Sequence, residues 1–375
     1  MKKVVIAIDS FKGCLPSVEA GKAAAEGIRS VYPECEVICL PIADGGEGML
    51  DVLIMATNGQ EVPISAHDPL MRWRNTYYGI SENEETAFIE MASISGLPLV
   101  PPEKRNPMLT TTYGTGEIIR DALERGCRNF IIGIGGSATN DAGLGMLQAL
   151  GFHFSDKEGK EVGTGRGEIL IKVAHIDSTF VHPALNSCRF TVACDVQNPF
   201  YGPEGAAYVF APQKGAGREM VEALDAGLQN FAEVIRHTTG KDISHHPGAG
   251  AAGGMGGSLL AFLNAELKPG IQLMLEALDF SNKIKSADLI ITGEGKADRQ
   301  TLMGKVPSGI LAEARKQHIP VILLAGNIED SDELQQAGFE GVFSVNPPLI
   351  SLEEAMRPEV ARKNIQQTVE SICKK

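Results

Sequence analysis

The chain has 375 residues, which is long for one domain and favours two. Hydrophobic residues make up 43% of it and charged residues 22%, a composition typical of a globular protein with a sizeable core. The net charge of −13 argues against nucleic acid or an anionic membrane surface as a partner, because both require a basic face.

Apolar runs that end in an acidic residue or a glycine cluster, each followed by a helical pattern, recur along the chain and predict a parallel α/β sheet. In the first half, strands are expected over residues 4–8, 37–42, 61–80, 88–92 and 130–134. The segment between 61 and 80 is interrupted by two prolines and a glycine, so we expect short antiparallel strands there. Helices are expected from Pro16, over 115–126 and over 140–151.

The second half of the chain has an irregular part and a regular part. Residues 152–215 are expected to form hairpins and loops, and three helices follow, over 219–237, 257–263 and 269–278. From residue 287 onward strands and helices alternate again, with strands over 289–291, 321–324 and 342–345 and helices over 307–317 and 353–373.

Strands and helices alternate regularly at both ends of the chain, whereas the middle of the chain is irregular. We therefore expect an α/β protein of two domains. Residues 1–60, 86–150 and 285–375 are predicted to form a discontinuous parallel-sheet domain of the Rossmann or flavodoxin-like kind. Residues 61–85 and 151–284 are predicted to form an inserted mixed α+β domain.

Acidic residues, glycines and a lysine follow the first two predicted strands. Asp9 and Lys12 follow the first, where they could place a metal ligand beside a phosphate ligand. The segment 44–48 follows the second and combines two acids with three glycines, which is a poor packing motif. Carboxylates suit Mg²⁺ and glycine N–H groups suit phosphate oxygens. The pattern therefore indicates an enzyme that handles phosphate.

Three later segments carry similar chemistry. Residues 133–143 form a strand, a glycine turn and a helix start, where backbone amides and two hydroxyl groups could attract an anion. Asp195 follows another strand, while Lys214 lies on a loop and says little by itself. The segment from 292 to Lys305 contains two acids and two lysines, a composition typical of phosphoryl transfer.

The glycine-rich run 248–257 matches GxGxxG in its letters, but no strand precedes it, so a dinucleotide site is not expected there. A glycine-rich loop before a helix still suits a phosphate group. The chain has no GxxxxGK[ST], no HExxH and no GxSxG, which argues against a P-loop enzyme, a zinc protease and an α/β-hydrolase.

The seven cysteines form no CxxC pair and sit mostly inside apolar runs, so we expect reduced, buried thiols in a cytoplasmic protein. A strand begins almost at once, and no apolar stretch reaches the roughly 20 residues that cross a bilayer. Neither a signal peptide nor a membrane span is therefore expected. A monomer and a homodimer both remain open.

Eight segments, in order along the chain, together closely resemble the bacterial glycerate kinase family, the class related to enzymes of glyoxylate and galactarate breakdown. They are DSFKG (9–13), PIADGGEG (41–48), EMASISGL (90–97), GIGGSATNDAG (133–143), ACDVQNP (193–199), PQKGA (212–216), GAGAAGGMG (248–256) and ITGEGKADRQT (291–301). Their number and order make the resemblance very specific, from residue 4 to about 345. Ile8, Met49 and Lys296 depart from the usual Pro, Thr and Arg of the family. Lysine keeps the charge of arginine but loses its bidentate geometry, which bears on substrate or nucleotide affinity.

The resemblance implies transfer of the γ-phosphoryl group of ATP to D-glycerate, giving 2-phosphoglycerate, with ATP and Mg²⁺ as cofactors. It also implies two α/β domains with the active site in the cleft between them. A kinase that gives 3-phosphoglycerate, or that acts on a related small hydroxy acid, is the alternative.

We expect Asp195 or Asp44 to orient and deprotonate the glycerate hydroxyl, with Lys12 as a further catalytic residue. The candidate Mg²⁺ ligands are Asp9, Glu47 and Glu294. Substrate and phosphate groups are expected to contact Ser10, Gly45, Gly46, Gly136, Ser137, Asn140, Asp141, Lys214, Gly253, Gly254 and Lys305.

Two functions of other classes compete with a kinase. A dinucleotide oxidoreductase would require an acid about 20 residues beyond a strand–GxGxxG unit, and the sequence contains no such unit. A metabolite-sensing module of the same fold would have little use for several acids and lysines at strand ends. Consumption of ATP on addition of glycerate is expected from a kinase and from neither rival.

Overall fold

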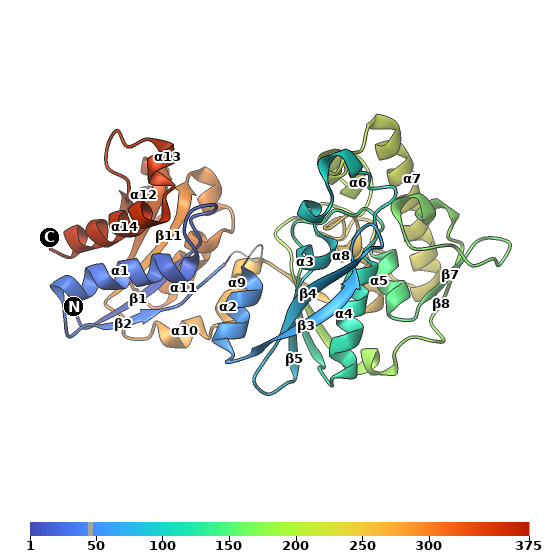
Figure 1. Ribbon diagram of the computed structural model, residues 1–375, viewed down its shortest axis with the longest axis horizontal. Coiled ribbons are helices and arrows are strands. Elements are labelled where there is room, and N and C mark those ends of the chain that lie inside the picture. Colours follow the sequence, from blue (N-terminus) through green and yellow to red (C-terminus); the bar gives the residue numbers. More distant parts are fainter. Residues whose placement is uncertain (44–47, 375) are drawn as a thin grey trace. The chain divides into compact units, whose positions relative to one another are not determined.

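The computed structural model describes residues 1–43 and 48–374 of the chain (Figure 1). The chain forms two compact units, one made of residues 1–44 and 271–375 and the other of residues 45–270. The first unit is thus built from both ends of the sequence. Each unit has its own sheet and its own hydrophobic core.

The first unit contains a five-stranded sheet in the order β13-β12-β11-β1-β2, and all its neighbouring strands are parallel. Its strands are β1 (Lys3–Ile8), β2 (Glu36–Cys39), β11 (Leu289–Ala297), β12 (Val321–Ile328) and β13 (Gly341–Ser344). The chain runs outward to β2 on one side of β1 and to β12 and β13 on the other side of β11. The direction of winding therefore reverses between β1 and β11, and such a switch point is where open α/β sheets bind ligands.

Helices cover this sheet because their apolar residues recur at helical spacing. They are α1 (Ser17–Val31), α9 (Gly270–Ala277), α10 (Phe280–Lys283), α11 (Val306–Lys316), α12 (Ser331–Gln336), α13 (Leu352–Ala355) and α14 (Pro358–Cys373). Helices α1 and α14 come from opposite ends of the chain and pack against each other (Figure 1). Their buried residues form one core cluster with Val4, Ile6 and Ile8 of β1.

Strand β11 is longer than the sequence predicts. The expected strand ends at Ile291, yet the observed strand continues through the Gly-Glu-Gly-Lys segment to Ala297. It can do so because it stays in register with β12, as shown by the pairing of Lys296 with Asn327. Glu294 consequently lies on a strand rather than on a loop.

The second unit contains a six-stranded sheet in the order β10-β9-β6-β5-β4-β3. Its strands are β3 (Gln60–His67), β4 (Trp73–Ile80), β5 (Thr86–Glu90), β6 (Asn129–Gly133), β9 (Arg189–Ala193) and β10 (Glu266–Lys268). Strands β5, β6, β9 and β10 are parallel, whereas β3 and β4 are antiparallel, as the sequence predicts for residues 61–80. A separate hairpin pairs β7 (His153–Ser155) with β8 (His175–Asp177).

Helices surround this second sheet and bury its faces (Figure 1). They are α2 (Met49–Ala56), α3 (Ala92–Ser95), α4 (Tyr113–Glu124), α5 (Leu144–Ala149), α6 (Ala206–Phe210), α7 (Arg218–Thr239) and α8 (Met255–Phe262). The longest, α7, carries Leu224, Leu228 and Phe231 on one buried face.

The predicted fold class is confirmed, because a parallel sheet comes from both chain ends and a mixed sheet from the middle. The predicted boundaries differ from the structure. Strands β5 and β6 lie in the mixed sheet, although residues 86–150 were expected to join the sheet of the chain ends. A buried parallel strand has the same apolar pattern in either sheet, so its pattern does not say which sheet it joins.

Two helix predictions also need correction. The single helix expected over 353–373 is interrupted, and α13 and α14 are separated before Pro358, which occupies the first position of α14. The helix expected to begin near Asn140 begins at Leu144 and has six residues. Residues 135–140 therefore do not form a helix N-terminus, and their backbone amides lie in the segment that precedes α5.

No helix in the described part of the chain is long and apolar enough to cross a membrane.

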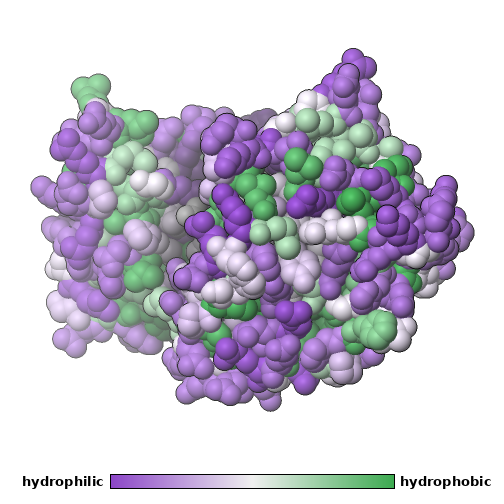
Figure 2. All heavy atoms as spheres, turned by 45° about the vertical axis from the view of Figure 1, so that its right-hand side comes forward, coloured by the Kyte–Doolittle hydropathy of each residue, from purple (hydrophilic) through white to green (hydrophobic). Residues whose placement is uncertain are grey.

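On the face drawn in Figure 2, hydrophobic residues lie in small groups separated by hydrophilic ones. All seven cysteines are free thiols, and four of them are buried.

Candidate active site

In the first unit, two buried acidic residues occupy neighbouring backbone positions where β1 and β11 approach their carboxyl ends. The backbone N–H of Asp9 donates a hydrogen bond of 2.9 Å to the carbonyl oxygen of Gly293. Ile8 is paired with Gly293 in the sheet, which places Asp9 next to Glu294. Each of the two acids is only 7% exposed. The strand pairing therefore brings together two residues that are 285 positions apart in the sequence.

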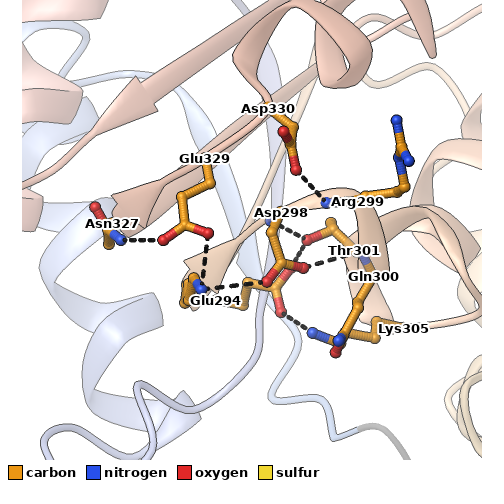
Figure 3. Close-up of polar contacts among 10 residues, drawn as sticks. Glu294, Asp298, Arg299, Gln300, Thr301, Lys305, Asn327, Glu329 and Asp330 are labelled. Carbon is orange, nitrogen blue, oxygen red and sulfur yellow. Dashed lines mark hydrogen bonds and ion pairs between the residues drawn. The ribbon is translucent and has the colours of Figure 1, made fainter.

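Glu294 is held by two further side chains (Figure 3). The hydroxyl of Thr301 donates a hydrogen bond of 2.6 Å to its Oε1, and the ammonium group of Lys305 lies 3.6 Å from its Oε2. Burial raises the pKa of Glu294, while Thr301 and Lys305 act in the opposite direction. The carboxylate thus has a fixed orientation before any ligand arrives.

Lys296 lies further along β11 and bridges two acids. Its ammonium group is 2.9 Å from Glu329 and 3.5 Å from Asp298, and it is half exposed. Glu329 also accepts a weak hydrogen bond of 3.4 Å from Asn327. The lysine that stands in place of the family's arginine is therefore part of an ion-pair network at the rim of the sheet.

A cavity of about 510 Å³ opens at the carboxyl ends of β1, β11, β12 and β13. Five residues predicted from the sequence line it: Asp9, Ser10, Lys12, Glu294 and Lys305. Lys296 of β11 also lines it, as do three polar residues from beyond β11 that the prediction did not include, namely Asn327, Glu329 and Asn346. They follow the apolar runs of β12 and β13, so the strand-end rule applied to Asp9 would have found them as well.

In the second unit, Lys214 carries its ammonium group into a fully buried position. The group donates hydrogen bonds of 2.7 Å to the hydroxyl of Ser137 and 2.6 Å to the carbonyl oxygen of Thr139. Burial lowers the pKa of Lys214 to about 7, and the nearby Asp141 carboxyl acts in the opposite direction. The structure thus brings together two predicted residues, Ser137 and Lys214, that lie on separate loops.

Asn140 and Thr139 follow in the same segment, and both are fully buried. Neither the amide oxygen and nitrogen of Asn140 nor the hydroxyl of Thr139 has a hydrogen-bond partner among the residues that the structure describes. Buried polar atoms of this kind normally have a partner, and an unmet one calls for an explanation. A bound ligand would provide one.

Asp141 has a different environment from Asn140. Its carboxylate accepts hydrogen bonds from the backbone N–H and the hydroxyl of Thr112 and from the N–H groups of Gly143 and Gly145. Burial raises its pKa, while these hydrogen bonds act in the opposite direction. The structure therefore gives Asp141 a role in holding the segment that precedes α5.

Asp195 follows β9 and is exposed. Its Oδ1 accepts a hydrogen bond of 2.8 Å from the backbone N–H of Gly270, the first residue of α9. This bond satisfies one of the N–H groups that a helix leaves unpaired at its start. It orients the carboxylate without burying it.

The predicted glycines lie where the backbone packs closely. A Cβ atom on Gly253 would lie 2.1 Å from the carbonyl oxygen of Thr139, and one on Gly254 would lie 2.9 Å from a methyl group of Leu228. Both glycines and Gly136 have positive φ angles. The glycine-rich run is therefore needed for its own packing against the segment that carries Asn140. Asp44, Gly45, Gly46 and Glu47 lie outside the described residues.

The carboxylates of the first unit fit a magnesium ion. Within residues 1–43 and 48–374, no three His, Cys, Asp or Glu side chains gather as a metal site. Mg²⁺ does not need such a cage, since it is commonly held by one or two carboxylates together with substrate phosphates and water. Asp9 and Glu294, with lysines beside them, meet that requirement.

Comparisons with known proteins match the same family over the sequence of both units. A family model described as the glycerate kinase family matches residues 4–375. The chain is 48% identical over 356 residues to the glycerate 2-kinase of Escherichia coli strain K12, covering 95% of this chain and 93% of that protein. It is 46% identical over 372 residues to the glycerate kinase of Bacillus subtilis strain 168, covering 99% and 97%. A crystal structure of a protein described as a candidate glycerate kinase 2 from Salmonella typhimurium LT2 matches with a TM-score of 0.91 at 43% identity, covering 100% of this chain and 97% of that one.

Proposed function

Because the chain belongs to the glycerate kinase family, we propose that it transfers the γ-phosphoryl group of ATP to the 2-hydroxyl of D-glycerate. The products are 2-phosphoglycerate and ADP. The choice of the 2-hydroxyl is supported by the name of the Escherichia coli relative, glycerate 2-kinase. The enzyme class is a phosphotransferase with an alcohol group as acceptor.

The observation that carries this proposal is the placement of Asp9 beside Glu294 in a cavity that Lys12 and Lys305 also line. Phosphoryl transfer requires little covalent chemistry from a protein, and catalysis consists mainly of positioning and charge neutralisation. Two fixed carboxylates with two ammonium groups at a switch point meet those needs. A dinucleotide oxidoreductase or a sensing module does not need this combination.

In this proposal the groups divide by charge. Lys12 and Lys305 neutralise phosphate oxygens, and Ser10 adds a hydroxyl donor. Asp9 and Glu294 would hold Mg²⁺, whose role when bound is to offset the negative charge of the phosphates that ATP supplies. Glu47 is the third candidate for a metal ligand.

The acid substrate needs a base and an anchor, and the residues singled out in the sequence include candidates for both. Asp195 or Asp44 orients the hydroxyl and accepts its proton. Asn140 and Ser137 contact the substrate with their polar side chains, and the unmet hydrogen-bonding groups of Asn140 favour this role. Lys214 supports the same segment through its bonds to Ser137 and Thr139.

The alternative is a kinase that forms 3-phosphoglycerate or phosphorylates a related small hydroxy acid. We propose a cytoplasmic location, as expected for an enzyme that consumes ATP. The assembly is a monomer or a homodimer, and light scattering of the purified protein distinguishes the two.

The direct experiment supplies purified protein with Mg²⁺, ATP and D-glycerate, measures ADP release, and identifies the product by ³¹P NMR. We expect the signal of 2-phosphoglycerate. A 3-phosphoglycerate signal would keep the kinase and overturn the position, and a folded protein without turnover would overturn D-glycerate as substrate.

The base is tested by Asp195→Asn. The amide keeps an oxygen that can accept from Gly270, so the fold should remain, while turnover should fall by roughly 10²–10⁴-fold. The matched control is Asp177→Asn, which alters another exposed Asp that accepts a backbone hydrogen bond, and it should keep normal turnover. Near-full turnover in both Asp195→Asn and Asp44→Asn would exclude both residues as the base.

A further inference from the structure

The cavity of the first unit has a charged lining and an apolar lining. Its charged groups follow β1, β11 and β12, where Asp9, Lys12 and Lys305 lie. Most of its apolar groups come from the chain after β13 and from α13 and α14, including Val345 and Ala355, and Phe11 adds an aromatic ring from the loop after β1. Such a cavity suits a ligand that has an anionic part and an apolar part.

Two large apolar side chains of this lining are exposed. Leu352 is 78% exposed and Met356 is 39% exposed, and both lie at or next to α13. Their exposure costs hydrophobic free energy that a bound apolar group would recover. The packing of the protein itself gives no reason for the exposure of Leu352.

The loop after β1 lies against this apolar wall. The thiol of Cys14 is 3.8 Å from the carbonyl oxygen of Ala355, and a Cβ atom on Gly13 would lie 3.4 Å from the methyl group of Met356. Lys12 therefore belongs to a loop that contacts α13. The charged end and the apolar wall are parts of one continuous site.

The wall is held in place before a ligand binds. The amide of Asn346 donates a hydrogen bond of 2.8 Å to the carbonyl oxygen of Gly326 and accepts one of 3.2 Å from Asn364 of α14. These bonds join the chain after β13 to β12 and to α14. Ser351 caps α13 through a hydrogen bond of 3.2 Å from the backbone N–H of Glu354.

D-glycerate does not explain this lining, because a three-carbon acid with two hydroxyl groups has almost no apolar surface. A purine nucleotide does, since its base is flat and largely apolar while its phosphates are anionic. Its size also suits the cavity, because sites for molecules of that class enclose roughly 300–1,000 Å³. Of the two substrates of a glycerate kinase, the nucleotide is the one that matches.

We propose that this cavity is the adenine nucleotide site, with the base against Leu352 and Met356 and the phosphates at Lys12 and Lys305. The assignment rests on the proposed kinase activity and adds to it the element that selects the nucleotide, the short helix α13. The phosphate chain ends at the switch point between β1 and β11, beside Asp9 and Glu294.

The test compares two probes, ADP and inorganic tripolyphosphate, by calorimetry on the full chain without glycerate. The double variant Leu352→Ser/Met356→Ser removes apolar contact with the base but no charge. It should weaken ADP binding by about tenfold or more, because two apolar side chains lose their burial against the base. Tripolyphosphate has no base, so its affinity should change by less than about twofold.

The matched control is Ile171→Ser/Phe180→Ser, which alters two exposed apolar residues of the second unit that are 52% and 69% exposed. It should leave both affinities unchanged. Equal ADP affinity in the wild type and in the Leu352/Met356 variant would overturn the proposal. Equal weakening of both probes would also overturn it, because that result places phosphates rather than a base at α13.

A second measurement locates the ligand independently of α13. Cys14 lines the cavity, and its thiol is free and partly exposed. Cys188 in the second unit also has a free, partly exposed thiol and serves as the control. Saturating ADP should slow the alkylation of Cys14 by iodoacetamide at least fivefold and leave that of Cys188 unchanged. An unchanged rate at Cys14 under saturating ADP would overturn the assignment.

Kinetics separate this proposal from the proposed function. In the Leu352/Met356 variant the KM for ATP should rise and the KM for D-glycerate should stay constant. A rise in the KM for D-glycerate alone would keep the kinase and overturn the nucleotide assignment. A wild-type protein that binds ADP in this cavity but does not phosphorylate D-glycerate would overturn the function and keep the nucleotide site.

Discussion

Lys214 is a lysine whose ammonium group is buried away from water. It is 2% exposed, and its ammonium group contacts a hydroxyl and a carbonyl oxygen rather than a carboxylate. Removing a charged amine from water is expensive, which is why its pKa falls to about 7 from an ordinary value of 10.5. Near neutral pH the amine of Lys214 therefore titrates in the folded protein, whereas it stays protonated in the unfolded chain.

This difference predicts a pH dependence of stability. Between pH 7 and pH 10.5 the unfolded chain binds more protons at Lys214 than the folded protein does, so the free energy of unfolding rises with pH. The free-energy cost of burying the Lys214 amine is absent above pH 10.5, where the amine is neutral in both states. This cost grows as the pH falls towards 7. Urea unfolding at pH 7 and pH 9 should show the wild type gaining stability relative to Lys214→Met, by up to about 1 kcal/mol per pH unit. Parallel profiles for the two proteins would contradict a neutral Lys214 at alkaline pH.

Thr301 is a second residue whose hydroxyl does two things at once. It donates to Glu294 and accepts a hydrogen bond of 3.0 Å from the backbone N–H of Asp298, and it is fully buried. Thr301→Val keeps the shape but removes the partner of the Asp298 N–H and of Oε1 of Glu294, which should lower the free energy of unfolding by about 1–3 kcal/mol. Thr301→Ser keeps the hydroxyl and should lose no more than about 1 kcal/mol, the value of one buried methyl group. Chemical denaturation measures both, and equal losses would mean that packing rather than hydrogen bonding holds Glu294.

At the scale of elements, the contact of α1 with α14 depends on a glycine. A Cβ atom on Gly27 would lie 2.5 Å from the carbonyl oxygen of Gln366 in α14, closer than real Cβ contacts allow. Gly21, on the same helix, would place its Cβ atom 3.9 Å from Ile6 and Cys39, which is ordinary contact distance. A side chain can therefore be accommodated at Gly21 but not at Gly27 without a shift of the backbone of α14.

This contrast gives a paired prediction within one helix. Gly27→Ala should lower the free energy of unfolding by about 1–3 kcal/mol, because the clash with a backbone atom exceeds the gain in helix propensity. Gly21→Ala should raise it by about 0.5–1 kcal/mol, because alanine favours the helix and meets no obstacle. Urea denaturation of both variants decides, and a stabilising Gly27→Ala would show that α14 can shift without cost.

Strand β11 shows how an element can differ from its local pattern. Glycine and lysine weaken strand propensity, so the segment after Ile291 indicates a loop when taken alone. Pairing with β12 as far as Ala297 and Ile328 overrides that preference. As a result Glu294 has the fixed direction of a strand residue.

At the scale of the whole molecule, the two units have separate cores. One core cluster contains residues between Val62 and Leu267, and the other contains residues from the two chain ends, such as Ile28 and Ile365. A domain with its own core can in principle fold alone. The middle unit is continuous in sequence, whereas the other needs both ends.

We therefore expect a fragment of residues 45–270 to fold by itself. It should show a single cooperative urea transition and the far-ultraviolet spectrum of an α/β protein, because its core is complete. It should have no kinase activity, since Asp9, Glu294 and Lys305 lie outside it. A fragment without a cooperative transition would show that the second unit depends on the chain ends, and the intact chain is the reference for both measurements.

The sequence by itself determined the alternation of strands and helices, the acids and glycines at strand ends, and the resemblance to one kinase family. Those features are local, because each depends on residues within one turn, strand or motif. It did not determine that β5 and β6 join the mixed sheet, or that Lys214 is buried.

Only the tertiary structure decided which strand ends meet. The pairing of β1 with β11 brings Asp9 beside Glu294, and the pairing depends on contacts between residues 285 positions apart. The bond between Lys214 and Ser137 spans 77 positions in the same way. Local propensity indicates the conformation of a segment but not which distant segments it contacts. The contacts between the site residues could therefore be established only from the tertiary structure.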